Sequence, residues 1–307
     1  MANKKNIKYT YEMQQIKTGF LVAYDYYLLK HALPLVYKSS DIIVLAIDIN
    51  RKTWAGNPFH IEPEFFEWIK AFDVDDKIKI YEDEFYVENL PLKEMETRQR
   101  NKLAQYLGLD GWHIQLDCDE YFMNFDEFVR KLQSIIQVDS SIFVKWKTIL
   151  KQDDKGYYFI SGFQERIPVA TNNPVYRFTR ITNNKNKINL NFTLLHQSWG
   201  RGESDVLMKL QNWGHARDYD VMSFFELWKS INRYNYKYIK DFQPLNPKAW
   251  PGIEYVETFD FNQIKDILIK DDDRIQSHRL KKIIRLLLPP IFYKISKYFR
   301  KSFFRLV

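Results

Sequence analysis

The stretch of sequence that decides the fold is residues 111–122, which read GWHIQLDCDEYF. An apolar run follows the glycine and ends in Asp117-Cys118-Asp119, with Glu120 directly behind it. This pattern predicts a buried strand that presents carboxylates at the edge of a sheet. Because burying a carboxylate is costly, these groups call for a partner, and Mg²⁺ or Mn²⁺ prefers such oxygen ligands and often shares them with phosphates. The alternative is a solvated turn, where acidic residues are common.

The segments before this strand alternate between strand and helix patterns. Strand patterns cover residues 18–24, 41–48 and 77–81. Helical spacing covers residues 26–38, 63–72, 93–107 and, after the acidic strand, 125–137. Pro34 is expected to break or bend the first of these helices. The order predicts an α/β fold with a mostly parallel central sheet and helices on both faces.

Several polar residues fall at the carboxyl ends of the predicted strands. Tyr24, Asp48, Asp117 and Asp119 all occupy such positions. Ligands of open α/β sheets bind beyond these strand ends, so we expect the four side chains to gather at one rim. Cys118 should face the interior, because successive strand residues point to opposite sides. It is the single cysteine, which rules out an intramolecular disulfide framework and fits a reducing compartment.

The second half of the chain is less regular. Strand patterns cover residues 141–150, 157–163, 174–181 and 191–196, and Ser204 can cap a helix over 205–213. The aromatic content of 17% is high. Flat aromatic faces stack on sugar rings and bases, although most of these residues are expected to build the core.

The positive charge of the chain is concentrated near its end. From residue 278 onward there are nine Lys or Arg and no Asp or Glu, which leaves 37 basic and 39 acidic residues before it. Apolar residues repeat at helical spacing among these cations, with Pro289-Pro290 between two segments. We therefore expect a basic amphipathic helical tail over 276–307 that binds an anionic membrane surface. Docking of the tail on the protein itself or on a partner is the alternative. The nearly neutral remainder argues against nucleic acid as a partner.

Residues 16–125 resemble glycosyltransferases with the Rossmann-like GT-A fold, of the inverting family 2 type. The resemblance rests on the strand at 20–24, the strand ending in Asp48, and Arg100-Asn101 followed by a glycine turn and an apolar strand ending in Asp-x-Asp. Residues 190–220 look more loosely like bacterial enzymes of this type that build surface polysaccharide or lipopolysaccharide, in which a His-x-Ser motif precedes an acidic residue and a lysine-bearing helix. The family's glycine-containing acidic loop and its Asn-Glu pair are replaced in this sequence, which leaves the nucleotide open.

The resemblance implies a metal-dependent, inverting transfer of a sugar from a nucleotide sugar to a membrane-associated glycan or glycolipid. A UDP- or GDP-sugar is favoured over a CMP-sugar as donor. Asp119, with Asp117 directly or through water, would hold Mn²⁺ or Mg²⁺, and His196 would complete the metal site unless it is a buried structural histidine. The nucleotide would contact Tyr24, Asp48, Arg100, Asn101 and Asp117.

The same resemblance places the catalytic base near the start of a helix after the Asp-x-Asp. Glu203 and Asp205 occupy such a place, and Glu165 is the other candidate. Acids in a first helical turn are also favoured by the helix dipole alone. Trp199, Trp213 and His215 would form the wall of the acceptor site.

The expected organisation is a glycosyltransferase domain over residues 1–275, with a nucleotide-sugar half at about 16–125 and an acceptor half at about 126–275, followed by the tail at 276–307. We expect a cytoplasmic enzyme, peripheral on the inner face of a bacterial-like cell membrane. Two alternatives remain open: a Mg²⁺-dependent nucleotidyltransferase or phosphotransferase, and a non-catalytic adaptor that binds a membrane or a polyanion. The glycines form no phosphate-binding loop pattern, which disfavours the former.

Overall fold

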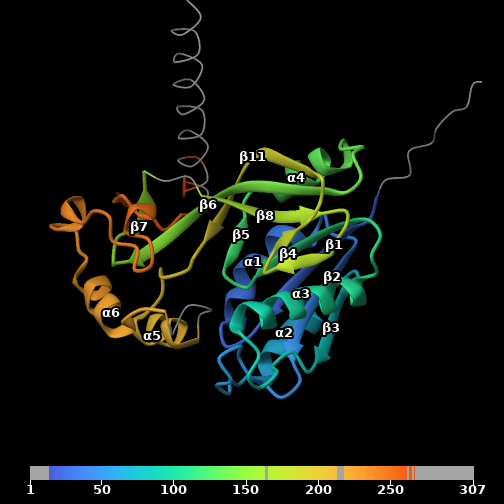
Figure 1. Ribbon diagram of the computed structural model, residues 1–307, viewed down its shortest axis with the longest axis horizontal. Coiled ribbons are helices and arrows are strands. Elements are labelled where there is room, and N and C mark those ends of the chain that lie inside the picture. The colour runs from blue at the N-terminus through green and yellow to red at the C-terminus, as the bar shows by residue number, and fades with distance from the viewer. Residues whose placement is uncertain (1–13, 163–164, 213–217, 261–262, 265, 267–307) are drawn as a thin grey trace, which may run out of the picture. The chain divides into compact units, whose positions relative to one another are not determined.

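The computed structural model describes residues 14–162, 165–212, 218–260, 263–264 and 266 (Figure 1). The described residues up to Glu257 belong to one compact unit, and those from Thr258 onward belong to a second. The predicted tail at 276–307 and the domain boundary at 275 lie outside the described residues. Within the described part of the chain, no helix is long and apolar enough to cross a bilayer.

The centre of the first unit is a parallel sheet with strand order β3-β2-β1-β4. Its strands are β1 (Ile16–Val22), β2 (Ile42–Asp48), β3 (Ile78–Asp83) and β4 (Trp112–Asp117). In this register Phe20 lies between Leu45 and Leu116. All residues of β1 are buried, and so are all but the first of β2. Both faces of the sheet are therefore covered, which explains why these strands have continuous apolar sequences.

Helices lie on opposite faces of this sheet. They are α1 (Leu29–Tyr37, preceded by the short η1, Tyr26–Leu28), α2 (Pro63–Phe72), α3 (Leu92–Leu107) and α4 (Phe125–Gln133). Gly19 faces Leu103 of α3. Thr18, on the other face of β1, hydrogen-bonds Ser40 directly after α1, with 2.7 Å between the hydroxyl oxygens. The predicted break or bend at Pro34 is not a break, because α1 continues through this residue to Tyr37.

Beyond β4 the sheet becomes mixed. β8 (Glu165–Thr171) is antiparallel to β4, β6 (Ser140–Gln152) is antiparallel to β8, and β11 (Asn186–His196) is parallel to β6. The short β5 (Glu120–Phe122) pairs antiparallel with β11 and brings His196 opposite Glu120. A separate pair of strands, β9 (Tyr176–Phe178) and β10 (Ile181–Thr182), follows β8.

A second core forms around the far end of the long strand β6, which extends the sheet toward β7 (Tyr157–Ser161) and β12 (Gly252–Val256) (Figure 1). The helices α5 (Glu203–Asn212) and α6 (Val221–Ser230) contribute to this core, and the short turns η2 (Tyr236–Tyr238) and η3 (Pro247–Ala249) lie before β12. Trp199 is 2% exposed in the same cluster. Its predicted place in an acceptor wall is therefore wrong, because its ring packs inside the protein. Trp213 and His215 lie outside the described residues.

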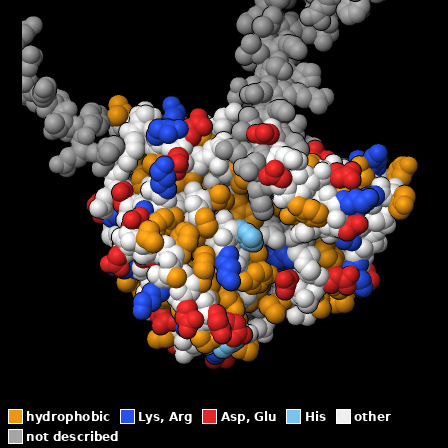
Figure 2. Space-filling view, turned by 180° about the vertical axis from the view of Figure 1, so that it is seen from behind, with side chains coloured by type: hydrophobic (Ala, Val, Ile, Leu, Met, Phe, Trp, Pro, Cys, Tyr) orange, Lys and Arg blue, Asp and Glu red, His pale blue; other side chains and the backbone are white. Residues whose placement is uncertain are grey.

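The predicted α/β class, with a parallel sheet core and helices on both faces, is confirmed. The surface seen in Figure 2 mixes basic and acidic side chains with hydrophobic ones, and acidic side chains gather along its lower edge. This mixture agrees with the nearly neutral charge of the chain before the tail.

Candidate active site

A pocket of about 120 Å³ opens at the carboxyl ends of the central strands. The chain passes from β1 to β2 and β3 on one side of β1 and then returns to place β4 on the other side, so the pocket lies where the strand order reverses. Ligands of open α/β sheets bind at such a point. The polar and aromatic residues that line it include Tyr24, Asp25, Asp48, Asp117 and Asp119 from the strand ends, Lys52, Thr53 and Trp54 from the loop after β2, Gln99 from α3, and Lys209 and Asn212 from α5. The predicted gathering of Tyr24, Asp48, Asp117 and Asp119 at one rim is confirmed.

Asp119 is buried and paired with cations. Its Oδ2 atom accepts hydrogen bonds from Arg201 Nη2 at 2.5 Å and from Lys209 Nζ at 2.6 Å. His196 Nε2 lies 3.4 Å from the same oxygen. Burial alone would raise the pKa of the Asp119 carboxyl, but Lys209, His196 and Arg201 together hold it well below its usual range. The group is therefore a carboxylate at neutral pH.

Asp117 is held by two other cations. Its Oδ1 atom accepts from Arg100 Nη2 at 3.0 Å, and its Oδ2 atom lies 2.7 Å from Arg180 Nη2. Arg180 also lies 2.8 Å from Glu120 Oε2, which accepts the backbone N–H of Asp117. Burial raises the pKa of Glu120 to about 7. This buried network fixes the turn between β4 and β5, and Asp117 is at the edge of the pocket with both oxygens engaged.

Two predicted nucleotide contacts have structural roles instead. The Arg100 side chain is fully buried and bridges Glu96 and Asp117. Asn101 exchanges hydrogen bonds with the backbone of Tyr176 and thereby attaches β9 to α3. Neither lines the pocket of about 120 Å³.

Both oxygens of the Asp48 carboxylate already accept hydrogen bonds from the backbone. Oδ1 accepts the backbone N–H groups of Asn50 and Lys52, and Oδ2 accepts those of Phe85 and Tyr86. A carboxylate with four such donors has little capacity left for a base or ribose. Asp48 therefore shapes the pocket wall by fixing the loops after β2 and β3.

The side chains do not fit the predicted divalent-metal site. Asp119 Oδ2 faces an ammonium and a guanidinium, and each oxygen of Asp117 faces an arginine. A metal ion bound to those three oxygens would compete with the cations that occupy them and would be repelled by their charge. Among the described residues, no cluster of three His, Cys, Asp or Glu side chains has a geometry that could hold a metal. His196 stacks on Trp146 at 4.2 Å between ring centroids, as a buried structural histidine would.

The three predicted base candidates do not line the pocket. Glu203 is exposed in the first turn of α5, and Glu165 is exposed at the start of β8. Asp205 accepts a hydrogen bond from Tyr27 Oη at 2.8 Å. The pocket instead contains Asp25, whose Oδ2 accepts from Arg201 Nη2 at 3.0 Å. Burial raises the pKa of Asp25.

Sequence reasoning missed Asp25, Arg180 and Arg201 as site residues. Lys209 could have been identified from the sequence, because the resemblance includes a lysine-bearing helix after the His-x-Ser motif. Cys118 is 1% exposed and its thiol donates to the Leu21 carbonyl, as predicted for a packing residue.

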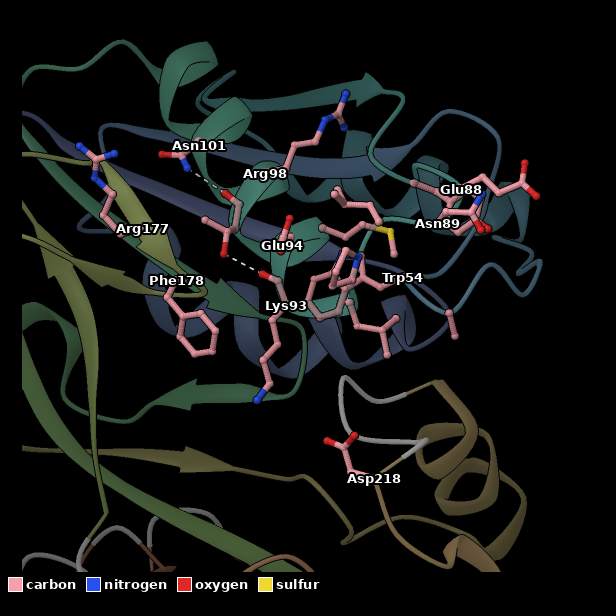
Figure 3. A pocket seen from close by; sticks show the side chains of 17 residues that line it. Trp54, Glu88, Asn89, Lys93, Glu94, Arg98, Asn101, Arg177, Phe178 and Asp218 are labelled. Carbon is pink, nitrogen blue, oxygen red and sulfur yellow. Dashed lines mark hydrogen bonds between the residues drawn. The ribbon is translucent and has the colours of Figure 1, made fainter.

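A second, larger cleft of about 1250 Å³ shares Trp54 with the pocket. Figure 3 shows Arg98, Asn101, Lys93 and Glu94 along α3 on one side, Arg177 and Phe178 on β9, and Asp218 across the opening. Phe178 is 48% exposed, and Lys93 Nζ lies 5.4 Å from its ring centroid. The cleft thus offers exposed aromatic faces and charged side chains of both signs beside the pocket.

No protein-family model and no curated protein matches this chain. The chain is similar to a crystal structure of residues 1–349 of TarS from S. aureus, at 12% identity and a TM-score of 0.29, over 46% of this chain and 37% of that one. It is also similar to 4-diphosphocytidyl-2C-methyl-D-erythritol synthase, at 13% identity and a TM-score of 0.30, over 53% of this chain and 77% of that one. Both likenesses are distant, so the functional proposal depends on the site geometry.

Proposed function

We propose that this protein is a glycosyltransferase that moves a sugar from a nucleotide-sugar donor to a glycan or lipid-linked acceptor. One observation carries the proposal: Tyr24, Trp54, Asp25, Asp119 and Lys209 converge on a pocket at the point where the strand order reverses. Aromatic faces, a carboxylate with raised pKa and a cation are the groups that such a transfer needs. The resemblance of residues 16–125 to GT-A glycosyltransferases points to the same reaction.

The donor would lie along the floor of this pocket. Tyr24 and Trp54 both line it and can stack on a nucleobase. Thr53 also lines it, and its hydroxyl, which donates to Asn212 Oδ1, can still accept a hydrogen bond from the ribose or base. Lys209, which also lines the pocket, would face the diphosphate. We retain a UDP- or GDP-sugar as the donor class on the basis of the resemblance.

In the reaction, an acceptor hydroxyl oxygen forms a bond to the anomeric carbon while the bond from that carbon to the diphosphate breaks. The diphosphate leaves with the electron pair, and the hydroxyl proton must pass to a base. We assign this role to Asp25, because each of the other three acids that line the pocket is held by at least two donors. Its raised pKa makes it a stronger base. Asp205 is the second candidate, and inversion of the anomeric configuration is the expected outcome.

The acceptor would occupy the larger cleft next to Trp54. Exposed aromatic residues such as Phe178 suit the flat face of a sugar ring, and a cleft of about 1250 Å³ suits a ligand larger than a nucleotide sugar. We propose a membrane-associated acceptor because of the basic amphipathic sequence after residue 278. The cytoplasmic, peripheral location remains part of this proposal.

The test is product analysis by mass spectrometry with UDP-, GDP- and CMP-sugars in turn. A glycosyltransferase releases the nucleoside diphosphate or monophosphate from one of these donors, slowly to water and faster when a glycolipid extract is added. Asp25→Asn should reduce this release by about 10²-fold or more while donor binding persists. Glu165→Gln and Glu203→Gln serve as matched controls and should keep wild-type rates. Pyrophosphate release from a nucleoside triphosphate and a sugar phosphate would instead identify a nucleotidyltransferase, and no turnover of any donor would refute the proposal.

A further inference from the structure

We infer that Lys209 and Arg201, rather than a divalent metal ion, offset the negative charge of the diphosphate in this pocket. Asp119 is then a positioning residue that holds the two cations and does not ligate a metal. The inference rests on the proposed function for the identity of the nucleotide, but the binding of a diphosphate group can be tested without it.

The first observation is where the Lys209 ammonium group lies. Lys209 comes from α5, lines the pocket and is 8% exposed. Its Nζ atom donates to Asp119 Oδ2 at 2.6 Å. An ammonium group has three N–H donors, so others remain for phosphate oxygens in the pocket. A buried, charge-assisted contact of this kind is stronger than one in water.

The second observation is that Arg201 has N–H donors that make no hydrogen bond within the described residues. Its side chain is 1% exposed, and Nη2 lies between Asp119 Oδ2 at 2.5 Å and Asp25 Oδ2 at 3.0 Å. Its Nε and Nη1 atoms are buried and have no hydrogen-bond partner among the described residues. Buried donors without acceptors are costly, and a guanidinium is well suited to phosphate oxygens. Arg201 does not itself line the pocket, so it would act on an anionic ligand from behind Asp25 and Asp119, whose side chains do line it.

The cations in and beside the pocket are paired with its carboxylates. Asp25 and Asp119 are matched one for one by Arg201 and Lys209. Lys52 lines the pocket as well, with Nζ 4.9 Å from the centroid of the Tyr86 ring. A diphosphate entering the pocket can share the Lys209 ammonium with Asp119, because this group has N–H donors beyond the one that Asp119 accepts. A divalent ion that used Asp119 Oδ2, by contrast, would compete with both cations for this oxygen.

The experiment is calorimetric titration of the full-length protein with UDP, GDP and inorganic pyrophosphate, in excess EDTA and again with excess Mn²⁺. The expected result is a dissociation constant that differs by less than about threefold between the two conditions. Binding in EDTA should also weaken steeply as the salt concentration rises, because the attraction comes from charged side chains. This salt titration uses the unaltered protein and so does not depend on any variant folding.

Three variants test the residue assignment. Lys209→Met should weaken metal-free binding by about tenfold or more, the loss expected for one charged hydrogen bond. Lys209→Arg retains the charge and should recover most of the affinity. Lys229→Met is the matched control, because Lys229 is a lysine on α6 that contacts the exposed Glu226. Circular dichroism establishes that each variant is folded.

The possible outcomes separate the two claims. Binding that occurs only with Mn²⁺, or that is unaffected by Lys209→Met in a folded protein, overturns the inference. If the nucleotides fail to bind but pyrophosphate binds in EDTA through Lys209, the cation assignment stands while the proposed function fails. If pyrophosphate and the nucleotides all fail to bind in EDTA, the cation assignment is wrong.

Discussion

Replacing Asp119 with asparagine provides a sharp test of how this pocket is built. The Asp119 side chain is 3% exposed and is the shared partner of Arg201 and Lys209, whose side chains are 1% and 10% exposed. The neutral amide of the Asp119→Asn variant would leave two buried cations with only Asp25 to neutralise them. Removing one partner of a buried ion pair typically costs about 3–5 kcal/mol, which is a large share of the roughly 5–15 kcal/mol that stabilises an average domain. We expect Asp119→Asn to lower the free energy of unfolding by about 3–5 kcal/mol.

Whether Asp119→Asn lowers or raises the free energy of unfolding shows whether Asp119 is paired with cations or is an unpaired carboxylate. If Asp119 were one of several unpaired carboxylates that await a metal ion, neutralising it would relieve repulsion and stabilise the protein in EDTA. Urea unfolding in EDTA, followed by tryptophan fluorescence, measures the difference. Glu226→Gln is the control, because this exposed acid contacts Lys229 at 3.3 Å and should leave the midpoint unchanged. An Asp119→Asn variant as stable as the wild type, or more stable, would refute the assignment of Asp119 as the partner of two buried cations.

Three further predictions concern packing, the proposed acceptor cleft and pH. Gly19→Ala places a Cβ atom 2.7 Å from Leu103 Cδ2 and should cost about 1–3 kcal/mol in urea unfolding, whereas Gly202→Ala meets nothing within 4 Å and should cost little. Phe178→Ala should raise the acceptor KM several-fold and leave the donor Kd unchanged, and Tyr234→Ala, which removes an exposed aromatic ring outside the cleft, should change neither. Burial raises the pKa of Glu120 from 4.5 to about 7, so the folded protein keeps a proton that the unfolded chain loses. The stability of the wild type relative to Glu120→Gln should therefore fall as pH rises through this window, and equal differences at about pH 5 and pH 8 would contradict that assignment.

The first half of the fold was predictable because its hydrophobic pattern reflects burial directly. The strands at 42–48 and 112–117 are covered on both faces and so have continuous apolar sequences. Helix α2 begins at Pro63 and ends at Phe72, as predicted from its proline start and helical spacing. Helix α4 ends at Gln133 rather than at 137, because the chain turns at Ser134.

The second half was less predictable because tertiary contacts decide its structure. Strand β8 was missed, since its sequence ERIPVAT contains Pro168 and two charges, and its place between β4 and β6 has no local signal. Helix α6 was also missed, although Asp220 caps it by accepting the N–H groups of Met222 and Ser223. That capping residue could have indicated the start of the helix.

The site also has a part that the sequence predicted and a part that it did not. The strand ends brought Tyr24, Asp48, Asp117 and Asp119 to one rim, as their positions predicted. The partners of the carboxylates could not be predicted, because Arg180 and Arg201 lie far away in sequence. Arg180 meets Asp117 from the turn between β9 and β10, and Arg201 meets Asp119 from the turn before α5. A sequence that shows two aspartates does not reveal whether an ion or a side chain neutralises them.

The carboxylate of Asp48 joins two loops that are otherwise independent in sequence. It accepts N–H groups from residues 50 and 52 on one side and from 85 and 86 on the other. A change of length in either loop would shift the common anchor and so disturb the other loop. Anyone who grafts loops onto this scaffold to alter the proposed nucleotide site should therefore exchange both segments together, with the aspartate retained.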